Sequence, residues 1–339
     1  MILSIDTPWQ PNAWNDELQK AFRHPEELLT FLGLTDANAD PAPQFPMLVP
    51  RNFAKRMQPT LSDPLLQQVL PQRTEQEDAP GFVKDPLNEH ANGFNKAPAL
   101  IQKYHGRALL LATPACAVNC RYCFRRHFPY AENRPGQHNQ ALLHIKSDPS
   151  ISEVILSGGD PLLLSDRPFS NLIDSLNDIA HVARIRIHSR IPIVLPERAN
   201  AALLETLSNS RARVILVTHA NHPAELDTDT ERALACYRAA GLWLFNQAVL
   251  LRGVNDNHQV QIELAHALFE QGVLPYYLHL PDRVAGTHHF FVNLEAAQVI
   301  YRKMQAALPG YLLPKLVREE PGAQAKTPAN EIAVESPTI

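Results

Sequence analysis

The chain has 339 residues, of which 45% are hydrophobic and 19% are charged, so wholesale disorder and a collagen-like composition are excluded. Lys and Arg number 31 against 35 Asp and Glu, and the formal net charge of −4 argues against a general nucleic-acid binder. No apolar run approaches the roughly 18 residues that span a bilayer, and the start MILSIDTPWQPNAWNDE lacks the pattern of a signal peptide. We expect a cytoplasmic protein without a membrane or nucleic-acid partner, whose four cysteines remain thiols.

Residues 1–100 are predicted to form a helical N-terminal extension. Helical apolar patterns cover Asn15–Phe31 and Asp63–Leu70, and proline-rich connectors such as PAPQFPMLVP separate them.

From about residue 107 the pattern changes to short, β-branched apolar runs. Six strands are predicted, at Arg107–Thr113, Glu153–Ser157, Ala183–Ser189, Arg213–Thr218, Leu242–Val249 and Tyr276–Leu280. Helices are predicted after them, at Asn139–Lys146, Pro168–Ile179, Arg198–Ser208, Thr228–Ala240, Gln259–Glu270 and Asn293–Leu308.

A strand followed by a helix every roughly 30 residues is typical of βαβ units and a parallel sheet. Six units are too few for a closed eight-fold barrel, so we predict an α/β fold with either an open sheet or a partial, TIM-like (β/α)6 barrel over residues 101–308. A short tail, residues 309–339, follows. In both arrangements the chemistry gathers at the carboxyl ends of the strands.

The strongest local feature is a cysteine cluster in the loop after the first of these strands. TPACAVNCRYCFRRHF places Cys116, Cys120 and Cys123 in the spacing C-x3-C-x2-C, and soft thiolates at this spacing suit an iron–sulfur cluster or zinc. Three ligands leave one metal position open, whereas a closed zinc site needs a fourth. A zinc site with a distant fourth ligand is the alternative. Cys236 lies within a helical pattern and is interpreted as a buried thiol.

Unusual residues also follow the later strands. Gly158 and Gly159 in LSGGDPL permit close backbone approach to a ligand, although a tight turn alone would explain them. Polar strand ends follow at HSR, VTHANH and FNQ, which include His219. One such histidine is more often structural than functional, but a recurring set would surround a single cavity.

The cysteine loop, with Tyr122 before its third cysteine, resembles the C-x3-C-x-aromatic-C signature of the radical S-adenosylmethionine (SAM) superfamily. The resemblance implies that Cys116, Cys120 and Cys123 hold a 4Fe–4S cluster whose remaining iron binds SAM. It also implies further residues that bind the cofactor, and our candidates are Ser157, Gly158, Gly159, Asp160 and His219.

A closer resemblance covers about residues 80–330. DPLNEHA, LSGGDPL, RIHSRIPIVLPER, VTHANHPAEL, NQAVLLRGVNDN, PYYLHLPD and KTP are similar to stretches of the lysine 2,3-aminomutase family. This implies a pyridoxal 5′-phosphate that is carried by Lys326 in EEPGAQAKTP. The family's glycine run before this lysine is reduced here to Gly322.

The resemblance also implies how an amino acid with a distant ammonium would be bound. Arg125 matches the arginine that pairs with the substrate carboxylate, a contact that suits a guanidinium. Asp282 and Glu319 match the two positions that hold the lysine ε-ammonium, although the family usually has Asp at the second. Lys103 and Arg107 are weaker candidates for the cofactor phosphate.

We therefore expect an isomerase that converts L-α-lysine to β-lysine and receives electrons from a flavodoxin- or ferredoxin-like reductant. The short chain and the stretch CAVNCRYCFRRHFPYAEN are most similar to bacterial members that make (R)-β-lysine, which a separate ligase attaches to elongation factor P. The alternatives are an aminomutase for another basic amino acid, one for free lysine metabolism, and a zinc-stabilised module that is not an enzyme.

Overall fold

The computed structural model describes residues 8–36, 38–89, 93–129, 138–329 and 332. The first seven residues, His90 and Ala91 of DPLNEHA, and the end of CAVNCRYCFRRHFPYAEN from Tyr130 lie outside this part of the chain.

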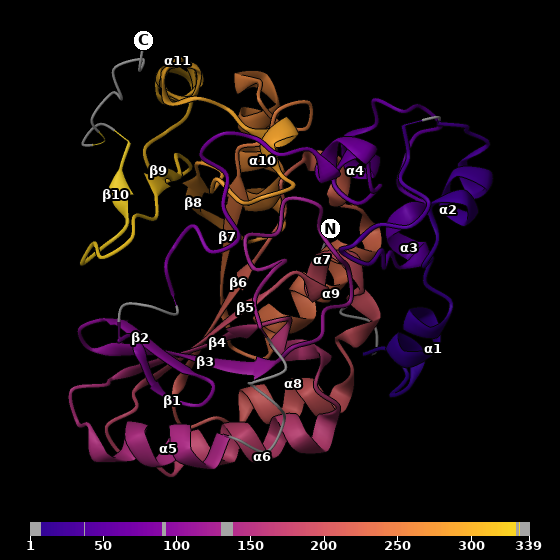
Figure 1. The fold of residues 1–339 in the computed structure, drawn as a ribbon. Helices are drawn as coiled ribbons and strands as arrows, with labels where there is room; N and C mark the ends of the chain where they lie inside the picture. Colours follow the sequence, from indigo (N-terminus) through magenta and orange to yellow (C-terminus); the bar gives the residue numbers. More distant parts are fainter. Residues whose placement is uncertain (1–7, 37, 90–92, 130–137, 330–331, 333–339) are drawn as a thin grey trace.

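Within the described residues, one curved sheet of ten strands in sequence order organises the molecule (Figure 1). The strands are β1 (Asn95–Ala97), β2 (Leu100–Tyr104), β3 (Arg107–Thr113), β4 (Glu153–Gly158), β5 (Arg184–Ser189), β6 (Arg213–Thr218), β7 (Trp243–Val249), β8 (Leu274–His279), β9 (Lys315–Arg318) and β10 (Thr327–Pro328). Strands β3 to β9 are parallel to one another, whereas β1, β2 and β10 are antiparallel to their neighbours.

The predicted α/β fold with a partial barrel is confirmed. Each predicted strand overlaps one of β3 to β8, and within the described residues β1 and β10 are edges, so the barrel is open. Strand β9 adds a seventh parallel strand from the tail, which was not predicted. The two antiparallel strands β1 and β2 were also not predicted.

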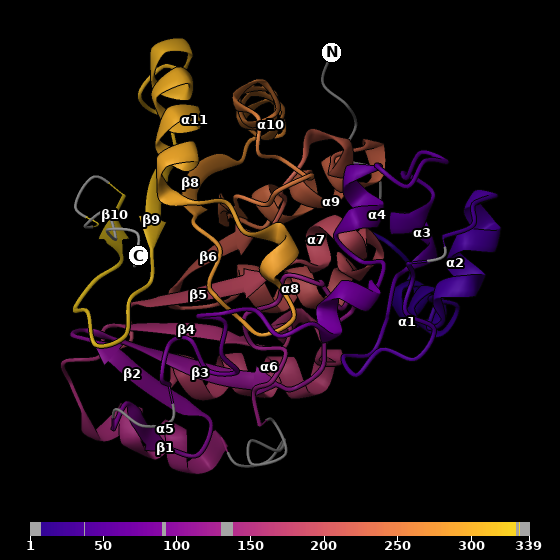
Figure 2. The same ribbon diagram turned by 45° about the horizontal axis from the view of Figure 1, so that its top comes forward.

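Helices lie on the convex side of the sheet, as α5, α6, α10 and α11 show in Figures 1 and 2. The α-helices are α1 (Ala13–Gln19), α2 (Pro25–Leu32), α3 (Arg51–Ala54), α4 (Pro64–Gln67), α5 (His138–Ser147), α6 (Asp166–Asn177), α7 (Ile191–Val194), α8 (Ala201–Ser208), α9 (Thr228–Ala239), α10 (His258–Glu270) and α11 (Leu294–Ala307). Short 3-10 helices are η1 (Arg73–Gln76), η3 (Pro161–Leu163), η4 (Pro196–Arg198), η5 (Pro223–Glu225) and η6 (His288–Phe290).

The helical pattern over Asn15–Phe31 is not one helix. It divides into α1 and α2 because Pro25 lacks a backbone N–H and begins a new helix. Between them Phe22 exchanges two backbone hydrogen bonds with Val49, at 2.8 and 3.0 Å. The helical prediction over Asp63–Leu70 is shortened to α4, whose first turn is capped by the Asp63 carboxylate.

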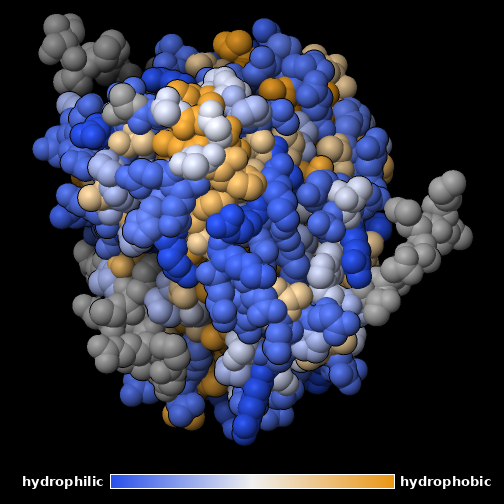
Figure 3. Space-filling model, turned by 90° about the vertical axis from the view of Figure 1, so that its right-hand side faces the viewer, coloured by the Kyte–Doolittle hydropathy of each residue, from blue (hydrophilic) through white to orange (hydrophobic). Residues whose placement is uncertain are grey.

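The N-terminal helices share one hydrophobic core with the barrel. Phe53 and Leu65 belong to the same buried cluster as Leu110 of β3 and Ile187 of β5. Figure 3 shows the side of the molecule that lies on the right in Figure 1. Its surface is mostly hydrophilic, with one larger hydrophobic area in the upper part of the view. Within the described residues no helix has both the length and the hydrophobicity to cross a bilayer.

Candidate active site

A cavity of about 370 Å³ opens at the carboxyl ends of the parallel strands. Every site residue predicted from the sequence lines it: Lys103, Arg107, Cys116, Cys120, Cys123, Arg125, Ser157, Gly158, Gly159, Asp160, His219, Asp282, Glu319 and Lys326. These residues come from strand ends and loops that are distant in sequence. Most of them follow the carboxyl ends of parallel strands, which meet at one edge, whereas Lys103 lies on the antiparallel β2 and Arg107 begins β3. Their individual roles remain predictions.

The cysteine loop is fixed in place by the N-terminal segment. Glu75 of η1 forms a hydrogen-bonded ion pair with the buried Arg121 and another with Arg126, at 2.6 Å. Burial would raise the pKa of the Glu75 carboxyl, but these two guanidinium groups lower it. The backbone N–H of Arg121 also donates to the carbonyl of Gln68, at 2.8 Å. The loop is therefore held from outside the barrel.

The donor set of this loop fits an iron–sulfur cluster. All three cysteines are free, partly accessible thiols. Burial, followed by the neighbouring thiols, raises the pKa of Cys116 well above its usual value and that of Cys123 to about 11. A bound iron centre would reverse this trend, because thiolates are its ligands. Among the described residues no three His, Cys, Asp or Glu side chains surround one ion-sized point. A 4Fe–4S cluster does not require that, since each cysteine binds a different iron.

The glycine pair at the end of β4 packs directly against this loop. A Cβ on Gly159 would lie 2.2 Å from the carbonyl oxygen of Ala115, and one on Gly158, whose φ is +114°, would lie 2.8 Å from that of Thr113. Only glycine lets the two backbones approach so closely. The glycines therefore let the end of β4 pack against the residues that precede Cys116, and both glycines line the cavity beside the cysteines.

Asp160, which follows the glycine pair, stabilises the loop after β4 through hydrogen bonds. One carboxylate oxygen accepts hydrogen bonds from Ser189 Oγ and Leu162 N, and the other accepts them from the backbone N–H groups of Arg190 and Ile191. Burial raises the pKa of this carboxyl to about 6. Both oxygens are thus engaged within the protein, and the side chain joins the end of β4 to that of β5.

The opposite side of the cavity is charged. Lys326 Nζ lies 2.6 Å from Glu319 Oε2, and Lys103 Nζ lies 3.4 Å from the other oxygen of Glu319. Tyr104 donates a hydrogen bond to Glu319 at 3.2 Å. Burial would raise the pKa of Glu319, but the two lysines hold it well below its usual range. In contrast, burial and the nearby Glu319 raise the pKa of Asp282 to about 7.

The predicted carboxylate-binding arginine already has an acidic partner. Arg125 donates to both oxygens of Glu89, at 3.2 and 3.3 Å, and to Ser157 Oγ at 3.3 Å. Lys103 also pairs with Glu89, at 3.0 Å. Glu89 was not identified from the sequence. Its position inside DPLNEHA was the only available signal, because its partners lie on other loops and strands.

Neutral histidines line the cavity between the cysteine loop and the charged side. Burial, followed by the charge of Arg190, lowers the pKa of His219 to about 3, and burial also lowers that of His188 and of His279 far below the usual value. His219 Nε2 lies 3.0 Å from Gln247 Nε2. His222, which belonged to the same polar series, instead caps η5. Cys236 is buried on α9, as the sequence indicated.

Comparisons with known proteins extend this description. No family model matches the chain. L-lysine 2,3-aminomutase of Escherichia coli (strain K12) is 44% identical over 335 residues, which cover 96% of this chain and 97% of that protein. The enzyme of the same name from Haemophilus influenzae is 41% identical, and the match covers 93% of this chain and 94% of that protein. The enzyme from Clostridium subterminale is 34% identical, and the match covers 95% of this chain and 78% of that protein. The solved structure of a radical SAM methyltransferase from Sphaerobacter thermophilus is 15% identical, with a TM-score of 0.44, and the match covers 65% of this chain and 68% of that chain.

An open parallel barrel with a C-x3-C-x2-C loop after its first parallel strand and a glycine pair after the next has the architecture of a radical SAM enzyme. The identities extend over nearly the whole chain, and the chain belongs to the radical SAM lysine 2,3-aminomutase family. The predicted family and the prediction of an enzyme are confirmed. A zinc-stabilised module without activity is not supported.

Proposed function

We propose that this protein is a pyridoxal phosphate-dependent lysine 2,3-aminomutase that converts L-α-lysine to (R)-β-lysine. The observation that carries the proposal is that one cavity joins the cysteine loop to the side chains of Lys326, Glu319 and Asp282. The relatives named L-lysine 2,3-aminomutase support the same activity.

The residues of the cavity suit three groups. Cys116, Cys120 and Cys123 would hold the 4Fe–4S cluster, and SAM would lie beside the Gly158–Gly159 backbone, which lines the same cavity. Lys326 would carry pyridoxal phosphate, and Arg107 would contribute positive charge for the phosphate. When bound, the cluster and SAM supply a hydrogen-abstracting radical, and pyridoxal phosphate supplies electron delocalisation to the migrating nitrogen.

The charged side of the cavity has the chemistry of a lysine-ammonium site. Glu319 is already in contact with two lysine ammonium groups, those of Lys326 and Lys103. An ε-ammonium of the substrate is the same chemical group, and it would find Glu319 and Asp282 in the same place. Glu319 already has these two counter-charges, so the preference for a basic side chain depends most on Asp282, whose buried carboxylate a neutral or acidic side chain would not stabilise.

The chain's remaining contribution is to orient the substrate and to exclude water. Arg125 would bind the substrate carboxylate, which must share or replace the contacts of Glu89. The uncharged His188, His219 and His279 would line the wall between the two charged ends without competing for either. A substrate held at both ends presents its β-carbon at a fixed position, and such positioning is a large part of catalysis.

The proposed metabolic role rests on the resemblance of the stretch CAVNCRYCFRRHFPYAEN to bacterial family members that serve elongation factor P. We propose that the (R)-β-lysine serves elongation factor P, to which a ligase attaches it, and that a flavodoxin- or ferredoxin-like protein reduces the cluster. Use of the product in free lysine metabolism and action on arginine are the alternatives.

Product analysis tests the proposal. The protein is reconstituted anaerobically with iron, sulfide and pyridoxal phosphate, and is supplied with SAM, a reductant and one of free lysine, free arginine or lysine-bearing elongation factor P. We expect (R)-β-lysine from free lysine only. Absence of β-lysine while the spectra of both cofactors are present would contradict the proposed activity.

The pH dependence of catalysis is expected to follow Asp282. Its pKa is raised to about 7, so its charge, and with it the attraction for a substrate ammonium, is lost as the pH falls through 7. We expect kcat/KM for lysine to rise about tenfold as the pH increases through this value, as the gain of one ionic contact implies. A profile for Asp282→Asn, which cannot ionise, should lack the rise. An unchanged profile in this variant would assign the ionisation to another group.

The same shift has a cost for folding. The pKa of Asp282 is higher in the folded protein than its usual value of 3.8, so the folded state keeps a proton that the unfolded chain releases. The free energy of unfolding therefore decreases as the pH rises from 3.8 to about 7. Asp282→Asn should therefore be at least as stable as the wild type at pH 8, as thermal unfolding would measure.

A further inference from the structure

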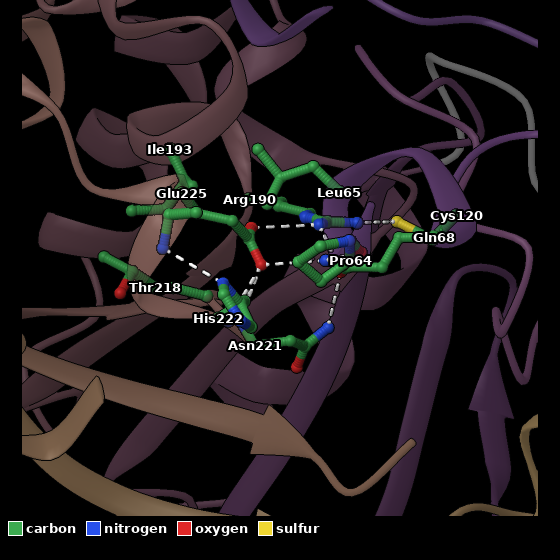
Figure 4. Close-up of polar contacts among 12 residues, drawn as sticks. Pro64, Leu65, Gln68, Cys120, Arg190, Ile193, Thr218, Asn221, His222 and Glu225 are labelled. Atoms are coloured by element: carbon green, nitrogen blue, oxygen red, sulfur yellow. Dashed lines mark hydrogen bonds and ion pairs between the residues drawn. The ribbon is translucent and has the colours of Figure 1, made fainter. Parts of the chain in front are cut away.

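A buried ion pair lies directly beside the cysteine loop, outside the substrate contacts described above (Figure 4). Arg190, which follows β5, is 4% exposed, and its partners Glu225 of η5 and Gln68 after α4 are fully buried. Neither residue of the pair has a role in the proposed binding of lysine or of pyridoxal phosphate. Burying a guanidinium and a carboxylate is expensive, so their position needs a reason.

The guanidinium of Arg190 is held in one orientation. One terminal nitrogen donates to Glu225 Oε2 at 3.0 Å and to Gln68 Oε1 at 2.7 Å, and the other donates to Cys120 Sγ at 2.7 Å. The aromatic rings of Phe53 and Tyr122 also lie near it, with centroids 5.5 and 5.6 Å from the guanidinium carbon.

Glu225 is fixed in turn, so the network is rigid from end to end. Its Oε1 accepts hydrogen bonds from the backbone N–H of Asn221 at 2.8 Å, from that of His222 at 3.1 Å and from Gln68 Nε2 at 3.1 Å. The Asn221 amide also donates to Gln68 Oε1, at 2.9 Å. The sulfur of Cys120 is the end of this network, in which both terminal nitrogens of Arg190 are engaged and its buried Nε has no hydrogen-bond partner among the described residues.

We propose that Arg190, positioned by Glu225 and Gln68, donates a hydrogen bond to the Cys120 sulfur that raises the reduction potential of the bound cluster. The proposal rests on the proposed function, because it requires the cluster. One-electron reduction adds negative charge to the cluster, and hydrogen bonds and positive charge at its sulfurs favour the reduced form. Glu225 offsets part of that charge, so the two residues act in opposite directions.

The opposite signs provide the test. The reconstituted protein is titrated with a reductant of known potential, without and with SAM, and the reduced cluster is followed by electron paramagnetic resonance. In Arg190→Gln we expect the equilibrium constant for reduction to fall about tenfold, which is a shift of about 59 mV to lower potential for one electron. In Glu225→Gln, which removes the compensating charge and keeps the shape, we expect a shift to higher potential.

Two further variants separate tuning from support of the fold. Arg190→Lys keeps a charged donor, so its cluster potential should shift less than that of Arg190→Gln. If Arg190→Gln binds no cluster, Arg190→Lys is measured instead. Arg198→Gln is the matched control, because Arg198 is an equally buried arginine whose partners are Asp166 and the carbonyls of Leu162 and Leu164 rather than a cysteine. Its cluster potential should equal that of the wild type.

Several results would overturn the inference. Unshifted potentials in cluster-loaded Arg190 variants, or shifts of the same sign in Arg190→Gln and Glu225→Gln, would contradict it. Lost SAM binding in Arg190→Gln at an unchanged potential would assign the guanidinium to SAM instead. A wild-type protein that takes up no cluster would refute the proposed function together with this inference, whereas a normal wild-type cluster with unshifted variants would refute this inference alone.

Discussion

Replacement of Lys326 by alanine is expected to reduce β-lysine formation at least about a thousand-fold, equivalent to about 4 kcal/mol of transition-state stabilisation. The amine of this residue is the proposed attachment point of pyridoxal phosphate, and no other lysine of the described residues lines the cavity except Lys103. Lys103 already pairs with two carboxylates, Glu89 and Glu319. The absorption band of bound pyridoxal phosphate should disappear, while the iron content should remain that of the wild type.

Lys326→Arg distinguishes attachment from charge. Arginine preserves a cation opposite Glu319, which Lys326 contacts at 2.6 Å, but its guanidinium stays protonated and cannot attack a carbonyl. This variant should therefore be as inactive as Lys326→Ala and more stable. Lys315→Ala, at an exposed position on β9, is the control and should retain activity. An Arg or Ala variant at position 326 that retains activity and the cofactor band would contradict the assignment.

The strands of the barrel could be predicted from the sequence because each is a short segment with recurring apolar residues, and in most of them alternate side chains are buried, as Ile185 and Ile187 are in β5. Arg107–Thr113 and Arg213–Thr218 coincide with β3 and β6. Elements whose sequence lacks that pattern were missed. Strand β9, Lys315–Arg318, has only four residues and forms because β8 offers it an edge to pair with. A pairing of that kind depends on tertiary structure.

The candidate site divides in the same way. The three cysteines could be identified because the chemistry requires them at fixed spacing, and Lys326 could be identified because its KTP stretch resembles that of a known family. The pairs that hold these motifs could not be. Glu89 meets Arg125 across 36 residues, and Arg190 meets Cys120 across 70. Each of these contacts exists only after the loops of different strands have met at one end of the sheet, and no local pattern encodes that.

Gly159→Ala is expected to be the most damaging single methyl addition at the cysteine loop. The new Cβ would lie 2.2 Å from the carbonyl oxygen of Ala115 and 2.8 Å from its backbone nitrogen, and backbone atoms cannot turn aside as a flexible side chain can. Overpacking of this kind costs on the order of 3 kcal/mol. Because Ala115 directly precedes Cys116, the loop must move away from β4, and we expect most of the iron content and the binding of SAM to be lost.

Iron and sulfide analysis, isothermal titration with SAM and thermal unfolding measure these effects. Gly310→Ala is the control, because a Cβ there meets no atom within 4 Å, and it should load iron and bind SAM as the wild type does. If Gly159→Ala assembles a complete cluster and binds SAM with unchanged affinity, then the close approach of the two backbones is not what shapes the space beside the cysteines. If it loads iron fully but binds SAM poorly, then the glycine serves SAM binding rather than cluster assembly. The expected loss of both would show that one backbone contact supports the two together.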